Sequence, residues 1–213
     1  MKMALSGKIA LSDVDGTIVR KSLVLNHAVT LHRDSIIDLG ELPERWVKDI
    51  KNESLITALA EGYRDSIVGK TVEDIRVNEY IADVVADKSN FYSILGRLTT
   101  LRDAGVPVVL ISGSPSYLVD RFAGNYGFKS AGSDYKMDSF GRFTGEVVGM
   151  FHGTAKRDYL TTLGLERYED ILAFGDTQSD APLFESASYS VLVEPTAETH
   201  AALFSLVHEI VTV

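Results

Sequence analysis

Short apolar runs alternate along the chain with longer segments whose apolar residues recur at helical spacing. The short runs predict buried strands at residues 8–12, 106–111, 171–174 and 190–193, and the run at residues 106–111 is rich in β-branched residues. The longer segments predict helices at residues 91–104, 117–126, 154–163 and 181–186, with a final helix from residue 199 onward. Strands that alternate with helices predict an α/β fold with a parallel sheet and helices on both of its faces.

Two stretches depart from this alternation. Residues 133–148 contain a polar, glycine-bearing turn between two extended segments and predict a β-hairpin. Residues 21–87 carry apolar residues at helical spacing, as at Trp46 and Ile50, and show no convincing strand. We therefore predict an all-helical cap of residues 21–87, inserted into a core domain that is formed by residues 1–20 and 88–213.

Composition narrows the class of protein. The 213 residues are 45% hydrophobic and 24% charged, which is ordinary globular usage. The net charge of −9 argues against a nucleic-acid or anionic-membrane partner. The chain has no cysteine, no secretion-type leader and no apolar run long enough to span a bilayer, so we expect a cytoplasmic protein without disulfides.

Polar residues follow three of the predicted strands. Asp13 and Asp15 come after the first strand, Ser112 after the second, and Asp176 after the strand at residues 171–174. The carboxyl ends of parallel strands line one crevice, so we expect these side chains to meet there. Adjacent carboxylates repel each other unless they share a cation, and oxygen ligands beside a phosphate favour Mg²⁺.

The same residue types suit phosphoryl transfer. A carboxylate can attack phosphorus and form an aspartyl phosphate, provided that positive charge offsets the two anions. Lys156 can supply that charge, and Ser112 with the amide of Gly113 can bind phosphate oxygens. Each element alone is typical of a turn, a helix cap or a solvated lysine. The occurrence of all four elements in this order along the chain favours a phosphate site over a set of unrelated turns, caps and surface lysines.

These residues resemble the four motifs of the haloacid dehalogenase (HAD) superfamily, in its phosphoserine-phosphatase-like branch. The first motif is Asp13-Val-Asp15-Gly-Thr17, and the second is Ser112 within Leu110-Ile-Ser-Gly-Ser114. The third is Lys156, and the fourth is Gly175-Asp176-Thr-Gln-Ser-Asp180. The resemblance implies a Rossmann-like core, a helical cap between the first and second motifs, and hydrolysis of a small phosphorylated metabolite with Mg²⁺.

The resemblance also implies individual roles. Asp13 would be the nucleophile, and Asp15 would protonate the leaving group, activate water and lend its backbone carbonyl to the metal. Ser112 and Lys156 would bind the phosphoryl group. The implied metal-binding residues are Asp13, Asp15, Asp176 and Asp180.

The chain departs from the branch in two places. Phosphoserine phosphatases carry a glutamate for the substrate ammonium nine residues after the nucleophile, where this chain has Ser22, so phosphoserine is not favoured as the substrate. Ser179 replaces the usual asparagine of the fourth motif, which should retune the metal shell. Arg20, Lys21 and Arg64 are candidates for binding a second anionic group, although each also reads as a solvated surface cation.

Two other functions use related chemistry. A phosphotransferase or phosphomutase of the same superfamily would differ only in the group that accepts the phosphoryl. A non-enzymatic phospho-acceptor signalling module also combines acidic residues, lysine and Mg²⁺ in a parallel sheet. Such a module accepts phosphate after a later strand and has no large helical insertion, so the sequence favours the phosphatase. The sequence leaves the oligomeric state open.

Overall fold

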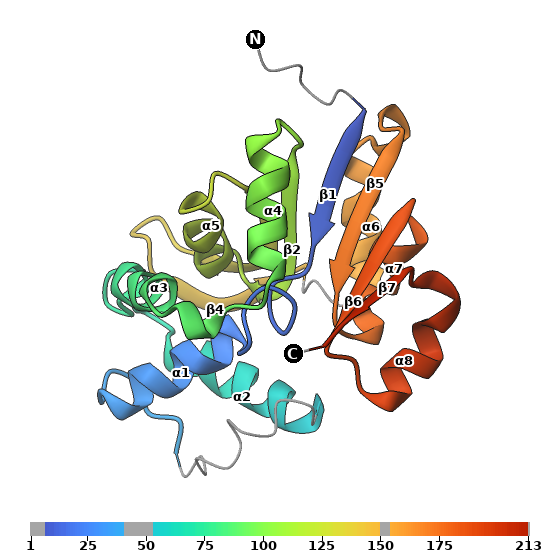
Figure 1. Cartoon of the computed structure of the whole chain (residues 1–213). Helices are drawn as coiled ribbons and strands as arrows, with labels where there is room; N and C mark the ends of the chain where they lie inside the picture. The colour runs from blue at the N-terminus through green and yellow to red at the C-terminus, as the bar shows by residue number, and fades with distance from the viewer. Residues whose placement is uncertain (1–6, 41–52, 150–153, 213) are drawn as a thin grey trace.

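The computed structural model describes residues 7–40, 53–149 and 154–212, and for residues 53–57 it describes the backbone alone. Seven strands form one sheet in the order β4-β3-β2-β1-β5-β6-β7 (Figure 1). The strands are β1 (Lys8–Ser12), β2 (Val108–Pro115), β3 (Lys129–Met137), β4 (Phe143–Val148), β5 (Asp170–Gly175), β6 (Tyr189–Val193) and β7 (Glu209–Val211). Every pairing is parallel except that of β3 with β4, which is the predicted hairpin.

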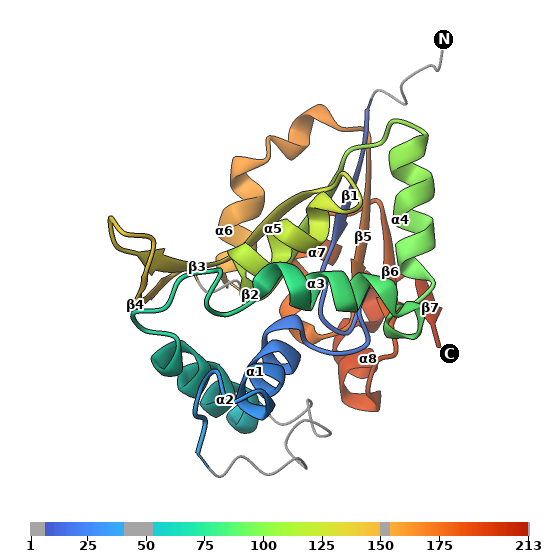
Figure 2. The same ribbon diagram turned by 90° about the vertical axis from the view of Figure 1, so that its left-hand side faces the viewer.

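Eight α-helices cover the described part of the sheet and its edge (Figures 1 and 2). Three lie in the predicted insertion: α1 (Leu23–Arg33), α2 (Glu53–Ser66) and α3 (Val77–Ala86). The other five are α4 (Ile94–Asp103), α5 (Ser116–Gly124), α6 (Thr154–Thr162), α7 (Ala181–Glu185) and α8 (Ala197–Leu203). The predicted helical stretch around Trp46 and Ile50 lies outside the described residues.

The alternation of side chains along the central strands creates two hydrophobic clusters. Ala10 of β1 and Leu110 of β2 face a cluster that includes residues of α1 to α5. Ile9 and Ile111 face the opposite cluster, with residues of α6 and α7. The predicted α/β architecture, a parallel sheet with helices on both faces, is therefore confirmed. Because α1, α2 and α3 share a cluster with α4 and α5, we keep the division into core and cap as a proposal.

The end of the chain differs from the prediction. The final helix is α8, which stops at Leu203, and the chain then turns into β7, parallel to β6. The three-residue β7 is too short to show a period in the sequence. Its position depends on residues far along the chain: it pairs with β6, and Glu209 forms a bidentate ion pair with Arg97 of α4.

Candidate functional site

The three predicted strand ends lie side by side. Ser12 at the end of β1 pairs with Leu110 of β2 on one side and with Phe174 of β5 on the other. The amide of Asp13 continues this pattern by donating to the carbonyl of Phe174 at 2.9 Å. The residues that follow these strands therefore share one edge of the sheet, as the sequence predicted.

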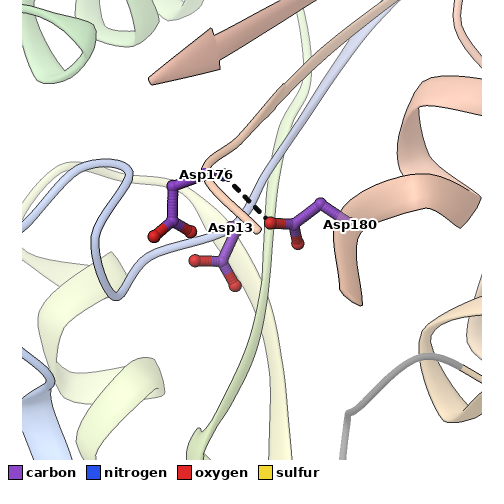
Figure 3. A group of neighbouring side chains, drawn as sticks. All are labelled: Asp13, Asp176 and Asp180. Carbon is purple, nitrogen blue, oxygen red and sulfur yellow. Dashed lines mark hydrogen bonds between the residues drawn. The ribbon is translucent and has the colours of Figure 1, made fainter. Parts of the chain in front are cut away.

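Three carboxylates meet at this edge. Asp13, Asp176 and Asp180 each offer an oxygen, and these atoms lie within 4.8 Å of one another (Figure 3). Asp13 and Asp180 are buried, and Asp176 is partly buried. Carboxylate oxygens gathered this closely match the donor set that Mg²⁺ prefers.

Lys156 of α6 lies against this group. Its ammonium donates to Oδ1 of Asp13 at 2.7 Å and to Oδ1 of Asp180 at 2.6 Å, and its side chain is only 2% exposed. Burial alone would lower the pKa of Lys156, but the two carboxylates outweigh it and hold that pKa above its usual range. Lys156 is therefore a buried cation.

The local charge does not balance without a further cation. Burial raises the pKa of the Asp13 carboxyl to about 8, although Lys156 opposes the shift. Burial and the charges of Asp13 and Asp180 likewise hold the pKa of Asp176 well above its usual range. With all three carboxylates ionised, Lys156 offsets only one of three negative charges. A divalent cation would neutralise the remainder, so the donor set fits Mg²⁺ by charge as well as by atom type.

Backbone amides orient Asp180. Its Oδ2 accepts from the amides of Asp176 and Thr177, each at 3.0 Å, and its other oxygen faces Lys156. Gly175 makes this approach possible, because a Cβ at that position would lie 2.6 Å from the Cβ of Asp180. The glycine before Asp176 is thus a steric requirement of the site.

Asp15 turns away from this group and toward the second motif. Its Oδ2 accepts from the hydroxyl of Ser112 at 2.6 Å, and its Oδ1 accepts from the backbone amide of Leu23 in α1. Ser112 is fully buried, and its oxygen also accepts from the amide of Ser114 at 3.0 Å. Asp13 and Asp15 therefore make different contacts, which suits different chemical roles.

Residues 10–185 match the model of the haloacid dehalogenase-like hydrolase family. The chain belongs to this family. A curated relative in the family's phosphatase branch, phosphoserine phosphatase SerB1 of Mycobacterium tuberculosis, is 28% identical over 206 residues. That alignment covers 88% of this chain and 65% of the relative, so the chain spans slightly less than two thirds of the relative's length.

Solved structures share this HAD fold at lower sequence identity. A protein of unknown function from Bordetella pertussis Tohama I superposes with a TM-score of 0.75 and 16% identity, covering 97% of this chain and 98% of the other. A phosphoserine phosphatase solved as an analogue of its phospho-aspartyl intermediate gives a TM-score of 0.65 and 16% identity, with coverages of 97% and 93%.

Two residues of the HAD site were not assigned a role from the sequence. The hydroxyl of Thr17 donates to Asp176 at 3.2 Å, and Gly16 allows Asp176 to approach the first loop. Both lie within the first motif, so their position in the Asp-Gly-Thr turn was the available signal. The amide of Leu23 belongs to the backbone, so the residue type at this position does not indicate its contact with Asp15. That contact depends on the three-dimensional structure.

The three candidate substrate-binding cations have surroundings other than the site carboxylates. The guanidinium carbon of Arg20 lies 4.3 Å from the ring centre of Tyr92, Lys21 is exposed, and Arg64 pairs with Asp65 at 2.8 Å. None of them forms an ion pair with the site carboxylates in the part of the chain that the structure describes. Their role in binding substrate stays a prediction.

Proposed function

We propose that this chain is a Mg²⁺-dependent phosphatase that hydrolyses a small phosphate monoester through an aspartyl phosphate on Asp13. The observation that carries the proposal is the meeting of Asp13, Asp176 and Asp180 around Lys156 in a member of the haloacid dehalogenase-like hydrolase family. This arrangement supports attack by a carboxylate on a phosphoryl group, because the opposing positive charge is already in place.

In the first half of the reaction, a carboxylate oxygen of Asp13 attacks phosphorus and forms a new P–O bond. The bond from phosphorus to the ester oxygen breaks, and its electron pair goes to the leaving oxygen. Asp15 donates a proton to that oxygen, so the leaving group departs as a neutral alcohol. Lys156 holds Asp13 and offsets the negative charge of the incoming phosphate.

In the second half, Asp15 is a carboxylate and accepts a proton from water. The resulting hydroxide attacks the same phosphorus, and the bond between phosphorus and Asp13 breaks. Inorganic phosphate is released, Asp13 is regenerated as a carboxylate, and Asp15 carries the proton needed for the next cycle.

The remaining site residues would hold the ion and the phosphate. Asp13, Asp176, Asp180 and the backbone carbonyl of Asp15 would hold Mg²⁺. Asp180 would act at longer range, because Lys156 occupies one of its oxygens and two backbone amides occupy the other. The bound ion supplies positive charge beside the phosphoryl oxygens. Ser112 and the amide of Gly113 would bind those oxygens, which requires the hydroxyl of Ser112 to turn from Asp15.

The substrate is the less constrained part of the proposal. Phosphoserine should be among the first compounds tested, because one relative is named as a phosphoserine phosphatase. However, the hydroxyl of Ser22 accepts from the amide of Leu25 and caps α1, so this position offers no charge for an ammonium group. We therefore propose a phosphorylated small molecule, with amino-acid and amino-alcohol phosphates as candidates among others.

Phosphate release tests the proposal. The purified chain is incubated with a panel of phosphorylated metabolites and with 4-nitrophenyl phosphate, with Mg²⁺ or with a chelator. We expect turnover only with the metal, and we expect Asp13→Asn to lower kcat by about 10³-fold or more while the protein stays folded.

A matched control is Asp158→Asn, which changes an exposed aspartate of α6 and should leave turnover unchanged. Robust phosphate release by Asp13→Asn would contradict the nucleophile assignment. Transfer of the phosphoryl group to an added alcohol, in preference to water, would indicate a phosphotransferase instead.

A further inference from the structure

The first turn of α1 lies directly against the HAD motifs. The amide of Leu23 donates to Oδ1 of Asp15, and the amide of Val24 donates to the hydroxyl oxygen of Ser114 at 3.3 Å. Amides in the first turn of a helix have no partner within the helix, so these contacts satisfy them. Where α1 lies therefore affects how Asp15 is held.

Tyr80 of α3 fixes that turn from the other side. Its hydroxyl donates to the backbone carbonyl of Leu23 at 2.8 Å and accepts a longer hydrogen bond, of 3.4 Å, from the side-chain amide of Asn26. The side chain is 6% exposed, so water does not readily replace these bonds. One residue, Leu23, thus contacts Asp15 through its amide and Tyr80 through its carbonyl.

The ring of Tyr80 is itself held in place. It stacks on the imidazole of His27, with 4.5 Å between ring centres and an interplanar angle of 30°. His27 is fully buried and is bonded to the carbonyl of Ile75 at 2.7 Å and to the hydroxyl of Tyr63 at 3.0 Å. A hydroxyl on a ring held this way has little freedom to leave Leu23.

We propose that Tyr80 is a positioning residue for Asp15. Resting on the proposed function, the inference is that Tyr80 holds Leu23 so that its amide occupies Oδ1 of Asp15. The other oxygen, Oδ2, then carries the proton that passes to the leaving oxygen as the P–O bond breaks. Loss of the Tyr80 hydroxyl should loosen Asp15 without removing any group that touches the substrate.

Dependence on the leaving group tests this role. Nitrophenolate is a weak base and departs with little help, whereas phenolate is more basic and needs a proton donor. We measure kcat/KM of wild type and Tyr80→Phe for 4-nitrophenyl phosphate and phenyl phosphate. We expect Tyr80→Phe to lose at least about 10-fold more activity on phenyl phosphate than on 4-nitrophenyl phosphate. Asp15→Asn should give the same pattern with a larger amplitude.

The matched control is Tyr189→Phe. Tyr189 lies on β6, and its hydroxyl donates to Glu209 of β7 at 3.0 Å, outside the set of contacts that runs from Tyr63 through His27 to Tyr80. A purely structural loss, as expected for this variant, should lower both activities in equal proportion. Thermal unfolding of both variants establishes that they fold, and Asn26→Ala, which loosens the Tyr80 hydroxyl, should shift the ratio in the same direction.

Equal losses on both substrates in Tyr80→Phe and in Asn26→Ala would overturn the inference and leave the proposed function standing. If wild-type protein releases phosphate from neither substrate nor from the metabolite panel, the proposed function fails, and the inference fails with it.

Discussion

Gly16 shows how closely the first and fourth motifs approach each other. Its φ is +84°, and a Cβ built there would lie 2.1 Å from Oδ2 of Asp176. Relieving this contact would move the carboxylate of Asp176, which is one of the three carboxylates that meet at the site. The glycine is therefore required by both the backbone conformation and the position of Asp176.

Gly16→Ala should displace Asp176 and reduce turnover. A displacement of about 1 Å at a reacting centre can lower the rate by about 10²-fold, and we expect a loss of that order. The measurement is phosphate release at saturating Mg²⁺, together with the Mg²⁺ concentration that gives half-maximal activity, which should rise.

Gly141→Ala separates the site effect from backbone strain. Gly141 also has a positive φ, of +73°, but a Cβ there meets nothing within 4 Å. Both variants should lose about 1 kcal/mol or more of unfolding free energy through the left-handed conformation. If both retain wild-type turnover, the proposed steric role of Gly16 is wrong.

At the scale of helices and strands, the sequence correctly predicted the elements that a periodic pattern of apolar residues or a turn marks. The four strands at residues 8–12, 106–111, 171–174 and 190–193 all exist, since short apolar runs that alternate with helical segments have few alternatives. The turn at Gly141 and the flanking extended segments correctly placed the β3–β4 hairpin. The residues after the strands came together because parallel strands end at the same edge.

What the sequence missed depends on contacts between distant residues. The short β7 exists because it completes the sheet beside β6, and its own three residues give no periodic signal. The separate contacts of Asp13 and Asp15 also could not be read from their spacing. They depend on where α6 brings Lys156 and where α1 brings the amide of Leu23.

His27 of α1 makes the unfolding free energy of the protein depend on pH. Burial lowers the pKa of His27 to about 4, against an ordinary value near 6.5, although its bond to the carbonyl of Ile75 opposes the shift. Between these two pH values the unfolded chain binds a proton at this position and the folded chain does not. The contribution of His27 to the unfolding free energy is therefore fully present above pH 6.5. It is lost as the pH falls from 6.5 toward 4, because protonation of His27 then stabilises the unfolded chain.

Urea unfolding measured at several pH values tests this prediction. His27 should contribute a loss of roughly 3 kcal/mol in unfolding free energy between pH 6.5 and pH 4. His27→Gln should be less stable at neutral pH, and its unfolding free energy should fall less over this range. His200→Gln, on α8, should keep the wild-type pH dependence. Parallel curves for wild type and His27→Gln would exclude the assignment.

At the scale of the whole molecule, the two hydrophobic clusters hold different halves of the site. Lys156 is carried by α6, whose Leu160 packs in the same cluster as Ile9, and Leu23 of α1 packs in the opposite cluster with Ala10. Figure 2 shows α6 beside the sheet and α1 beyond the carboxyl ends of the strands. The carboxylates lie at the sheet edge between them. Within the described residues, none of the helices has the length and hydrophobicity of a bilayer-spanning segment.

A site with excess buried negative charge should make the folded state respond to divalent cations. Asp13, Asp176 and Asp180 converge only in the folded chain, so Mg²⁺ should bind it in preference to the unfolded chain. At a Mg²⁺ concentration 100-fold above Kd, the gain is about 2.7 kcal/mol, or roughly 5–10 °C in Tm for a chain of this length. Thermal unfolding with Mg²⁺ and with a chelator measures this shift in Tm.

Asp176→Asn should lose most of the shift, while Asp158→Asn, on the surface of α6, should retain it. An equal Mg²⁺ response in both variants would mean that the ion binds elsewhere, and the chemistry proposed for this edge of the sheet would then lack its cation.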